Sequence, residues 1–388
     1  MKSLNLLSIK NLSISADNIN ILNDISFNLK KNQILGVVGE SGSGKSITSL
    51  SIINLLKSKN FQRRGKVIFK GNRIDSITNK EFEKIRGCEI SMIFQEPMSS
   101  LNPSMKCGYQ VIETMIKHKV LNDVNETKNV LNLFEKVKLK NPEAVFNKYP
   151  HELSGGQQQR VMIAIAISCN PKILIADEPT TSLDAIVKEE IIILLKEIQK
   201  KNKMSIILVS HDLNLVSKIA HNLIVLNKGK IVESGKGNKV FKNPQCDYTK
   251  MLLRSRPPKK TRPSRLPTIE NNLKSFSLIP KKDRIEKHLK IYNQKPILKV
   301  DNLSFSYNEK LILNKVSFKL YKRETLGLVG ESGSGKSTIA KSILKLINYK
   351  HGEIFYKNID IKKYDKKIFA KNIQLIFQDP YSSLNPQK

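Results

Sequence analysis

The side chains best suited to chemistry lie in an eight-residue glycine-rich motif that occurs twice. The copies are Gly39-Glu40-Ser41-Gly42-Ser43-Gly44-Lys45-Ser46 and Gly330-Glu331-Ser332-Gly333-Ser334-Gly335-Lys336-Ser337. Glycines allow successive backbone N–H groups to point at phosphate oxygens, and a helix that follows adds partial positive charge. Because the apolar run 34–38 precedes the first motif and a helical pattern over 47–56 follows it, the motif predicts a nucleotide-phosphate loop. We expect Lys45 to meet the β- and γ-phosphates and the Ser46 hydroxyl to ligate Mg²⁺.

Amide, carboxylate and imidazole side chains follow three further apolar runs, each of which predicts a buried strand. Gln95 follows 90–94, Asp177 and Glu178 follow the run that starts at 173, and His211 follows 205–210. We expect Gln95 to reach Mg²⁺ and the attacking water, Asp177 to hold the metal, and Glu178 to orient the water. We expect His211 to contact the γ-phosphate. Taken alone, Gln95 also fits an ordinary loop residue, and His211 an ordinary surface residue.

A second potential anion contact opens a predicted helix over 155–168. Ser154 is a good N-cap for this helix, and the paired glycines Gly155 and Gly156 leave backbone N–H groups open to an anion. Gln157 completes the pattern. From the residues alone, a phosphate-contacting helix and a plain capped helix both explain it.

The duplication extends beyond the glycine-rich motif. Residues 9–15 match 300–306, and residues 21–27 match 312–318, in the same register as Lys45 and Lys336. Residues 93–103 match 376–386, which places Gln378 at the position of Gln95. We therefore expect Lys336, Ser337 and Gln378 to repeat the phosphate and Mg²⁺ contacts of the first copy.

Charge, cysteine spacing and the length of apolar runs argue against several classes of function. The chain carries 67 Lys and Arg against 34 Asp and Glu, a net charge of +33. Such a charge can indicate a nucleic-acid or anionic-membrane partner, but the lysines are scattered, so we expect no specific nucleic-acid partner. The four cysteines show no C-x-x-C spacing, which argues against a zinc site or a disulfide framework. No apolar run reaches the roughly 18 residues of a membrane span, so we expect a soluble chain that meets membranes through partners.

Patterning along the chain predicts three regions. Residues 5–30 alternate apolar and polar residues, as half-buried antiparallel strands do, and residues 105–149 show mainly helical spacing. Residues 254–295 are rich in Pro, Lys and Arg with few apolar residues, which is typical of a semi-extended linker. We expect a complete domain over 1–253, a linker over 254–296 and a partial second domain over 297–388.

The order of these motifs resembles the nucleotide-binding domain of ABC transporters. Residues 39–46 look like its Walker A motif, Gln95 like the Q-loop, 153–157 like the signature, 173–178 like Walker B, 182–184 like the D-loop and His211 like the switch histidine. The resemblance implies an α/β P-loop NTPase fold with an antiparallel β subdomain and a helical subdomain, followed by a partial second copy. It also implies ATP and Mg²⁺ as cofactors and Glu178 as the catalytic carboxylate.

The residues around Gln95 resemble one subgroup of this family more than others. Residues 94–103 and 241–253 resemble importers of oligopeptides, dipeptides, nickel and glutathione, and the tandem domains resemble glutathione and microcin-C-type peptide importers. This implies an ATP-hydrolysing subunit on the cytoplasmic face of the bacterial inner membrane, with two permease subunits and a periplasmic solute-binding protein. Two positions depart from the family. Tyr307 stands where the family stacks an aromatic ring on adenine, but its counterpart is Ala16, and Cys246-Asp247 replaces His-Pro.

In this family, each ATP lies between the Walker motifs of one domain and the signature of another. Applied here, the first site lacks an opposing signature, whereas the second has 154–157 to oppose it but lacks Walker B and the switch histidine. We therefore expect the missing half of the second domain, or a second copy of the chain, to complete the sites. Two other interpretations stay open: a soluble tandem ABC ATPase acting on ribosomes or nucleic acid, and a non-catalytic truncated remnant.

Overall fold

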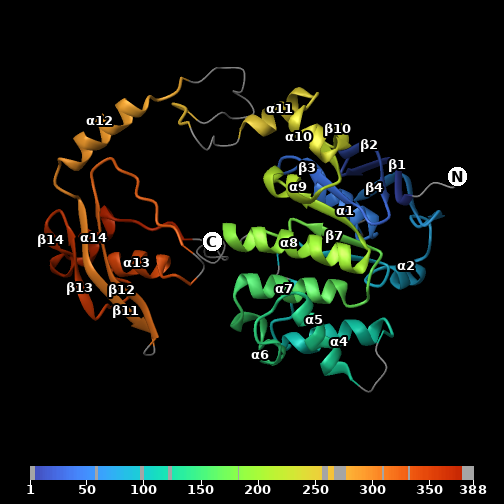
Figure 1. The fold of residues 1–388 in the computed structure, drawn as a ribbon, viewed down its shortest axis with the longest axis horizontal. Helices are drawn as coiled ribbons and strands as arrows, with labels where there is room; N and C mark the ends of the chain where they lie inside the picture. The colour runs from blue at the N-terminus through green and yellow to red at the C-terminus, as the bar shows by residue number, and fades with distance from the viewer. Residues whose placement is uncertain are drawn as a thin grey trace. The chain divides into compact units, whose positions relative to one another are not determined.

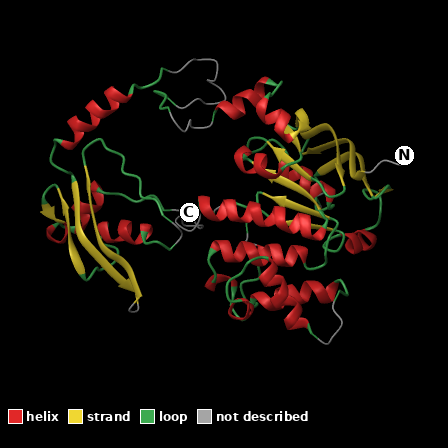
Figure 2. Ribbon diagram, in the orientation of Figure 1, coloured by secondary structure: helices red, strands yellow, loops and turns green. Residues whose placement is uncertain are grey.

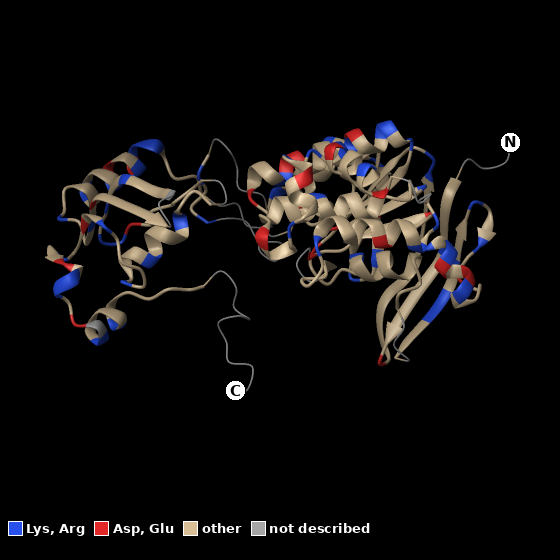
Figure 3. Ribbon diagram, turned by 90° about the horizontal axis from the view of Figure 1, so that it is seen from below, with Lys and Arg blue, Asp and Glu red and all other residues tan. Residues whose placement is uncertain are grey.

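The chain forms two units, each with its own core (Figure 1). The computed structural model describes residues 5–56, 60–96, 100–120, 125–181, 183–255, 261–265, 277–307, 310–330 and 333–377. The first unit holds the described residues up to 255, and the second holds 261–265 and 277–377. Lys and Arg are spread over both units, with Asp and Glu scattered among them (Figure 3).

An antiparallel sheet opens the first unit, in the strand order β2-β1-β4-β5. Its strands are β1 (Asn5–Ala16), β2 (Ile19–Lys30), β4 (Phe61–Phe69) and β5 (Asn72–Arg73). One face of β1 and β2 is apolar and buried, as the alternating sequence predicts. The predicted antiparallel subdomain is confirmed.

A six-stranded sheet forms the centre of the same unit, in the order β10-β9-β3-β8-β7-β6. Its strands are β3 (Ile34–Val38), β6 (Ile90–Ile93), β7 (Ile173–Asp177), β8 (Ser205–Ser210), β9 (Asn222–Asn227) and β10 (Lys230–Lys236). β3, β6, β7, β8 and β9 run parallel, and β10 is antiparallel to β9. The carboxyl ends of the parallel strands therefore meet at one edge, where ligands bind in open α/β sheets.

Both faces of this sheet are covered, which explains why its strands are continuous apolar runs. In β7, Leu174 and Ala176 face a core shared with the helices. Ile173 and Ile175 face a second core shared with β1, β2 and β4. The predicted buried strands, and the α/β fold class, are confirmed.

Helices complete the first unit (Figure 2). They are α1 (Lys45–Ile52), α2 (Asn79–Ile85), α4 (Cys107–Lys117), α5 (Glu126–Lys136), α6 (Pro142–Phe146), α7 (Gly155–Ile167), α8 (Ala185–Asn202), α9 (Leu213–Ile219), α10 (Gly237–Lys242) and α11 (Asp247–Arg254), with a 3₁₀ turn at Pro150–Glu152. α4, α5, α6 and α7 pack together as the predicted helical subdomain. Within the described ranges, no helix is both long and apolar enough to cross a bilayer.

The second unit repeats the antiparallel sheet of the first, in the order β12-β11-β13-β14. It contains α12 (Lys281–Tyr292), β11 (Leu298–Tyr307), β12 (Lys310–Leu320), α13 (Lys336–Ile343), β13 (His351–Tyr356), β14 (Ile359–Asp360), a 3₁₀ turn at Ile361–Lys363 and α14 (Lys366–Asn372). The two sheets share their pairing, since Leu7 opposes Phe69 in one and Leu298 opposes Tyr356 in the other.

The segment before the glycine-rich loop is a buried strand in the first unit but not in the second. Residues 325–329 match β3 in the repeat but form no strand. Val38 of β3 is 0% exposed, whereas its counterpart Val329 is 94% exposed. β3 is hydrogen-bonded to β8 on one side and β9 on the other, and the described part of the second unit contains no such neighbours. An apolar strand without paired edges cannot satisfy its backbone groups in a buried position.

Candidate nucleotide-phosphate site

The first glycine-rich loop connects β3 to α1 at the carboxyl edge of the central sheet. Gly42 and Gly44 adopt φ values of 79° and 100°, which side chains with a Cβ rarely adopt. A Cβ on Gly39 would lie 2.2 Å from the Leu226 carbonyl oxygen, and one on Gly44 would lie 2.5 Å from Leu22 Cδ2. Close packing therefore requires glycine at positions 39 and 44, and backbone conformation favours it at position 42, which leaves the loop backbone to form a phosphate cradle.

Lys45, the first residue of α1, turns back into the loop. Its ammonium group donates hydrogen bonds to the carbonyl oxygens of Gly39 (3.1 Å) and Glu40 (2.7 Å). It lies 3.8 Å from Glu178 Oε1. Burial lowers the pKa of Lys45, and the negative charges of Glu178, Asp177 and Glu40 oppose this shift. The positive charge is thus fixed between the phosphate loop and the two acids that follow β7.

Asp177 ends β7 and is 3% exposed. Its Oδ1 atom is buried without a hydrogen-bond partner in the described structure. Burial raises the pKa of this carboxyl, and a hydrogen bond with Ser46 counters the rise. A buried carboxylate oxygen without a partner, next to a serine hydroxyl, matches the hard oxygen ligands that Mg²⁺ prefers. Ser46 and Asp177 therefore fit this cation.

Glu178 occupies a strained position. Its φ is 47°, in the left-handed region, and its N–H donates to the Val209 carbonyl oxygen of β8 (3.0 Å). Its Oε2 atom accepts a hydrogen bond from Thr181 Oγ1 (3.0 Å) and lies 2.9 Å from His211 Nδ1. Such backbone strain persists where the surroundings determine it, and it commonly accompanies function. The structure therefore brings Lys45, Glu178 and His211 together, although they come from three different strand ends.

Other predicted residues lie elsewhere. Gln95 follows β6 and is exposed, and it makes no hydrogen bond with any described residue of the cluster. Ser154 is the N-cap of α7, where its side chain accepts from the Gln157 N–H (3.4 Å) and Gln157 Oε1 accepts from the Ser154 N–H (3.0 Å). Ser154 and Gly155 are exposed, and Gly156 packs against Val187 of α8. The amino end of α7 is thus open to a ligand or partner.

The described residues of the second glycine-rich loop repeat features of the first. Gly333 and Gly335 have φ values of 81° and 93°, and Lys336 donates to the Gly330 carbonyl oxygen (2.7 Å). Ser334 lies within the loop, and Ser337 lies in the first turn of α13. Tyr307 ends β11 and is 66% exposed. Of the predicted residues, Ser182, Glu331, Ser332 and Gln378 lie outside the described residues.

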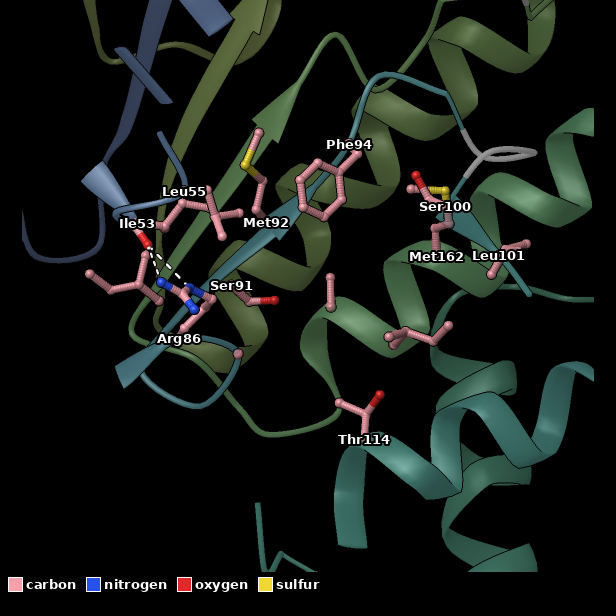
Figure 4. A pocket seen from close by; sticks show the side chains of 14 residues that line it. Ile53, Leu55, Arg86, Ser91, Met92, Phe94, Ser100, Leu101, Thr114 and Met162 are labelled. Carbon is pink, nitrogen blue, oxygen red and sulfur yellow. Dashed lines mark hydrogen bonds between the residues drawn. The ribbon is translucent and has the colours of Figure 1, made fainter. Parts of the chain in front are cut away.

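A mainly apolar pocket of about 230 Å³ adjoins the Gln95 segment in the first unit (Figure 4). Its lining includes Leu55, Met92, Phe94 and Met162. The Arg86 guanidinium at its edge donates to the carbonyl oxygens of 53 and 54 at 3.0 to 3.2 Å. No residue of the phosphate loop lines this pocket, so it is separate from the chemistry at Lys45.

Two side chains that contact predicted site residues are not themselves among the predicted site residues. Thr181 holds Glu178, and its only signal is a hydroxyl residue three positions after an acid. Tyr248 contacts Glu40 of the phosphate loop across 208 positions of sequence, and no local pattern could reveal that contact.

A protein-family model described as "ABC transporter" matches residues 22–181 and 313–388, more than half of the chain. This chain belongs to the ABC transporter family. The family assignment and the predicted P-loop ATPase fold are therefore confirmed.

Known relatives and solved structures support the same family assignment. The chain is 36% identical over 415 residues to the "Glutathione import ATP-binding protein GsiA" of Shigella dysenteriae serotype 1 (strain Sd197), covering 99% of this chain and 66% of that protein. It is 35% identical over 418 residues to the protein of that name from Escherichia coli (strain K12), with the same coverages. The chain thus spans just under two thirds of the length of these relatives.

Two solved structures show the fold of the first unit. One is the dimeric ATP-binding cassette MJ0796 in a post-hydrolysis state bound to ADP and Pi, with 29% identity, a TM-score of 0.53, and coverage of 59% of this chain and 98% of that one. The other is cbiO1 from Clostridium perfringens, part of the ABC transporter complex cbiONQ, with 29% identity, a TM-score of 0.55, and coverage of 65% and 96%.

Proposed function

We propose that the chain binds and hydrolyses ATP with Mg²⁺ and thereby powers a membrane importer for peptides or related small solutes. The observation that carries this proposal is the cluster of Lys45, Ser46, Asp177, Glu178 and His211 at one edge of the central sheet. The relatives named as glutathione import ATP-binding proteins support the transport role and its solute class.

In this proposal, each side chain has one task in the attack of water on the γ-phosphate. Lys45 and the loop N–H groups stabilise the charge that develops on the phosphate oxygens. Glu178 orients the water and accepts its proton, and His211 and Thr181 hold the carboxylate in place. When bound through Ser46 and Asp177, Mg²⁺ would neutralise charge on the β- and γ-phosphates.

We further propose that the first site is completed by a partner. The exposed amino end of α7, at Ser154–Gln157, is suited to face a phosphate loop on another domain, where its N–H groups would meet the γ-phosphate. We retain a nucleotide-binding domain over 1–253, a linker over 254–296 and a second, partial domain over 297–388. The unpaired segment at 325–329 supports a second domain that needs strands equivalent to β8 and β9 beside it.

We propose that the chain is a peripheral subunit on the cytoplasmic face of the membrane. Its partners are two permease subunits, which work with a periplasmic solute-binding protein, and a permease segment docks at the apolar pocket beside Gln95. The pocket's apolar lining suits a permease segment, and Phe94 places that segment next to Gln95. Replacing Thr114 on the pocket wall with Lys should detach the chain from permease-containing membranes without changing its ATP turnover. Undiminished membrane binding by that variant would contradict the docking assignment.

Nucleotide binding is the decisive test of the ATPase proposal. Mg-ATP should raise the thermal unfolding midpoint of the chain, since a ligand that binds only the folded state stabilises it. Lys45→Ala should remove most of this shift, and Lys45→Ala with Lys336→Ala should remove all of it. If the double variant binds Mg-ATP as the wild type does, or if the chain purifies with RNA and not with membranes, the proposal fails.

A further inference from the structure

Tyr248 touches the phosphate loop from a part of the chain that the chemistry above does not use. It lies in the first turn of α11, and its hydroxyl accepts a hydrogen bond from the Glu40 N–H at 3.2 Å. The same hydroxyl lies 3.4 Å from Glu40 Oε2, to which it can donate. Burial raises the pKa of Tyr248, so the hydroxyl keeps the proton that this second contact requires.

Glu40 is one of two adjacent loop residues, with Gly39, whose carbonyl oxygens hold the Lys45 ammonium. The Glu40 carbonyl oxygen accepts the Lys45 ammonium at 2.7 Å and the Ser43 N–H at 3.2 Å. The Glu40 N–H, held by Tyr248, shares one planar peptide unit with the Gly39 carbonyl, which also accepts the Lys45 ammonium (3.1 Å). Moving the N–H anchor would tilt the carbonyl that directs the ammonium group.

The position of Tyr248 is itself fixed by a strand of the central sheet. Glu233 of β10 accepts hydrogen bonds from the N–H groups of Gln245 (2.8 Å) and Cys246 (3.1 Å), just before α11 begins. This carboxylate supplies the cap that Cys246, at the N-cap position, does not provide from its own side chain. Thr249 and Leu252, 0% and 9% exposed, anchor the same helix in the core.

We propose that Tyr248 is a positioning residue for the first nucleotide site, and that Glu233 acts through it to set the orientation of Lys45. This inference rests on the proposed nucleotide site and adds to it a link between the segment after β10 and the phosphate loop. A movement of α11 would change the position of Lys45, because the Tyr248 hydroxyl links this helix to the phosphate loop.

The test compares tyrosine variants in the full chain carrying Lys336→Ala, so that only the first loop is read. Tyr248→Phe should weaken Mg-ATP binding about 3- to 10-fold, the effect of one lost hydrogen bond. Tyr109→Phe is the matched control, because the Tyr109 ring lies against Phe146 in the helical subdomain. Neither variant should change the unfolding midpoint without nucleotide.

A double-variant cycle separates positioning from general stability. Glu233→Gln should weaken Mg-ATP binding in the wild-type background but cause no further loss when Tyr248→Phe is already present. Equal losses from Glu233→Gln in both backgrounds would overturn the proposal. So would unchanged affinity in Tyr248→Phe, or an affinity loss in Tyr248→Phe that is matched by lower stability of the nucleotide-free protein. Lys45→Ala distinguishes failure of the proposed nucleotide site from failure of the role of Tyr248. If Lys45→Ala leaves Mg-ATP binding unchanged, the nucleotide site is wrong. If Lys45→Ala weakens binding but Tyr248→Phe does not, only the role of Tyr248 is wrong.

Discussion

Glu178→Gln provides the sharpest test of the chemistry, because it removes a charge and preserves the shape of the side chain. Glu178 Oε1 lies 3.8 Å from the Lys45 ammonium. Two unit charges about 4 Å apart interact by about 4 kcal/mol at an effective dielectric constant of about 20. The glutamine removes this attraction, which frees Lys45 to turn toward phosphate, and it also removes a negative charge near the γ-phosphate.

Binding and turnover should therefore respond in opposite directions. Affinity for Mg-ATP should stay the same or rise, whereas phosphate release should fall about 10²- to 10⁴-fold, the usual contribution of a general base. Bound nucleotide should remain ATP, and the trapped protein should elute as a closed dimer. The assays are displacement of a fluorescent nucleotide, steady-state phosphate release and size-exclusion chromatography. Glu189→Gln, on the exposed face of α8, is the matched control and should behave as the wild type does.

His211 offers an internal check on this reasoning, because it contacts the same Glu178 Oε2 atom. His211→Ala should slow turnover by itself but add little when Glu178→Gln is already present, since residues that act as a unit are not additive. Hydrolysis by Glu178→Gln at the wild-type rate would refute the assignment of the base. Loss of Mg-ATP binding by that variant would refute the charge argument.

Three further perturbations test other parts of the structure. Val38→Asp should lower the unfolding midpoint of the first unit sharply, because it buries an unpaired charge, whereas Val329→Asp, at a position 94% exposed, should leave the melting curve unchanged. Ala16→Tyr should tighten ATP binding at the first site by about 5- to 150-fold if the ring stacks on the base, an interaction of about 1–3 kcal/mol, and Tyr307→Ala should weaken the second. Burial alone would raise the pKa of Glu233, but hydrogen bonds to its carboxylate, including those from the N–H groups of Gln245 and Cys246, outweigh it and hold that pKa below its usual value. The carboxylate therefore stabilises the fold above about pH 4.5 and loses this contribution as pH falls through its folded pKa, so urea unfolding should show the cost of Glu233→Gln shrinking at acid pH.

Much of the first unit could be predicted from local patterns. The glycine-rich loop, the buried strand before Asp177 and the N-cap at Ser154 are encoded by residues close together in sequence. The meeting of the glycine-rich loop and Asp177 at one sheet edge follows from the parallel pairing of their strands. The contact of Tyr248 with Glu40 could not be predicted, because it depends on where α11 packs after the whole sheet has formed.

The segment at 325–329 shows where pattern prediction reaches its limit. Its sequence, TLGLV, differs from the ILGVV of β3 at only two positions, with Thr325 for Ile34 and Leu328 for Val37, and both precede the same glycine-rich motif. Strand propensity is therefore shared, yet only β3 is paired and buried. Burial of a central parallel strand requires hydrogen-bonded neighbours on both edges and cover on both faces, and these are supplied by distant residues. In the first unit, His211 follows β8, a neighbour of β3, and Asp177 and Glu178 lie at the end of β7, which pairs with β8. Strands equivalent to these, which would bury 325–329, would therefore also bring the proposed catalytic groups to Lys336.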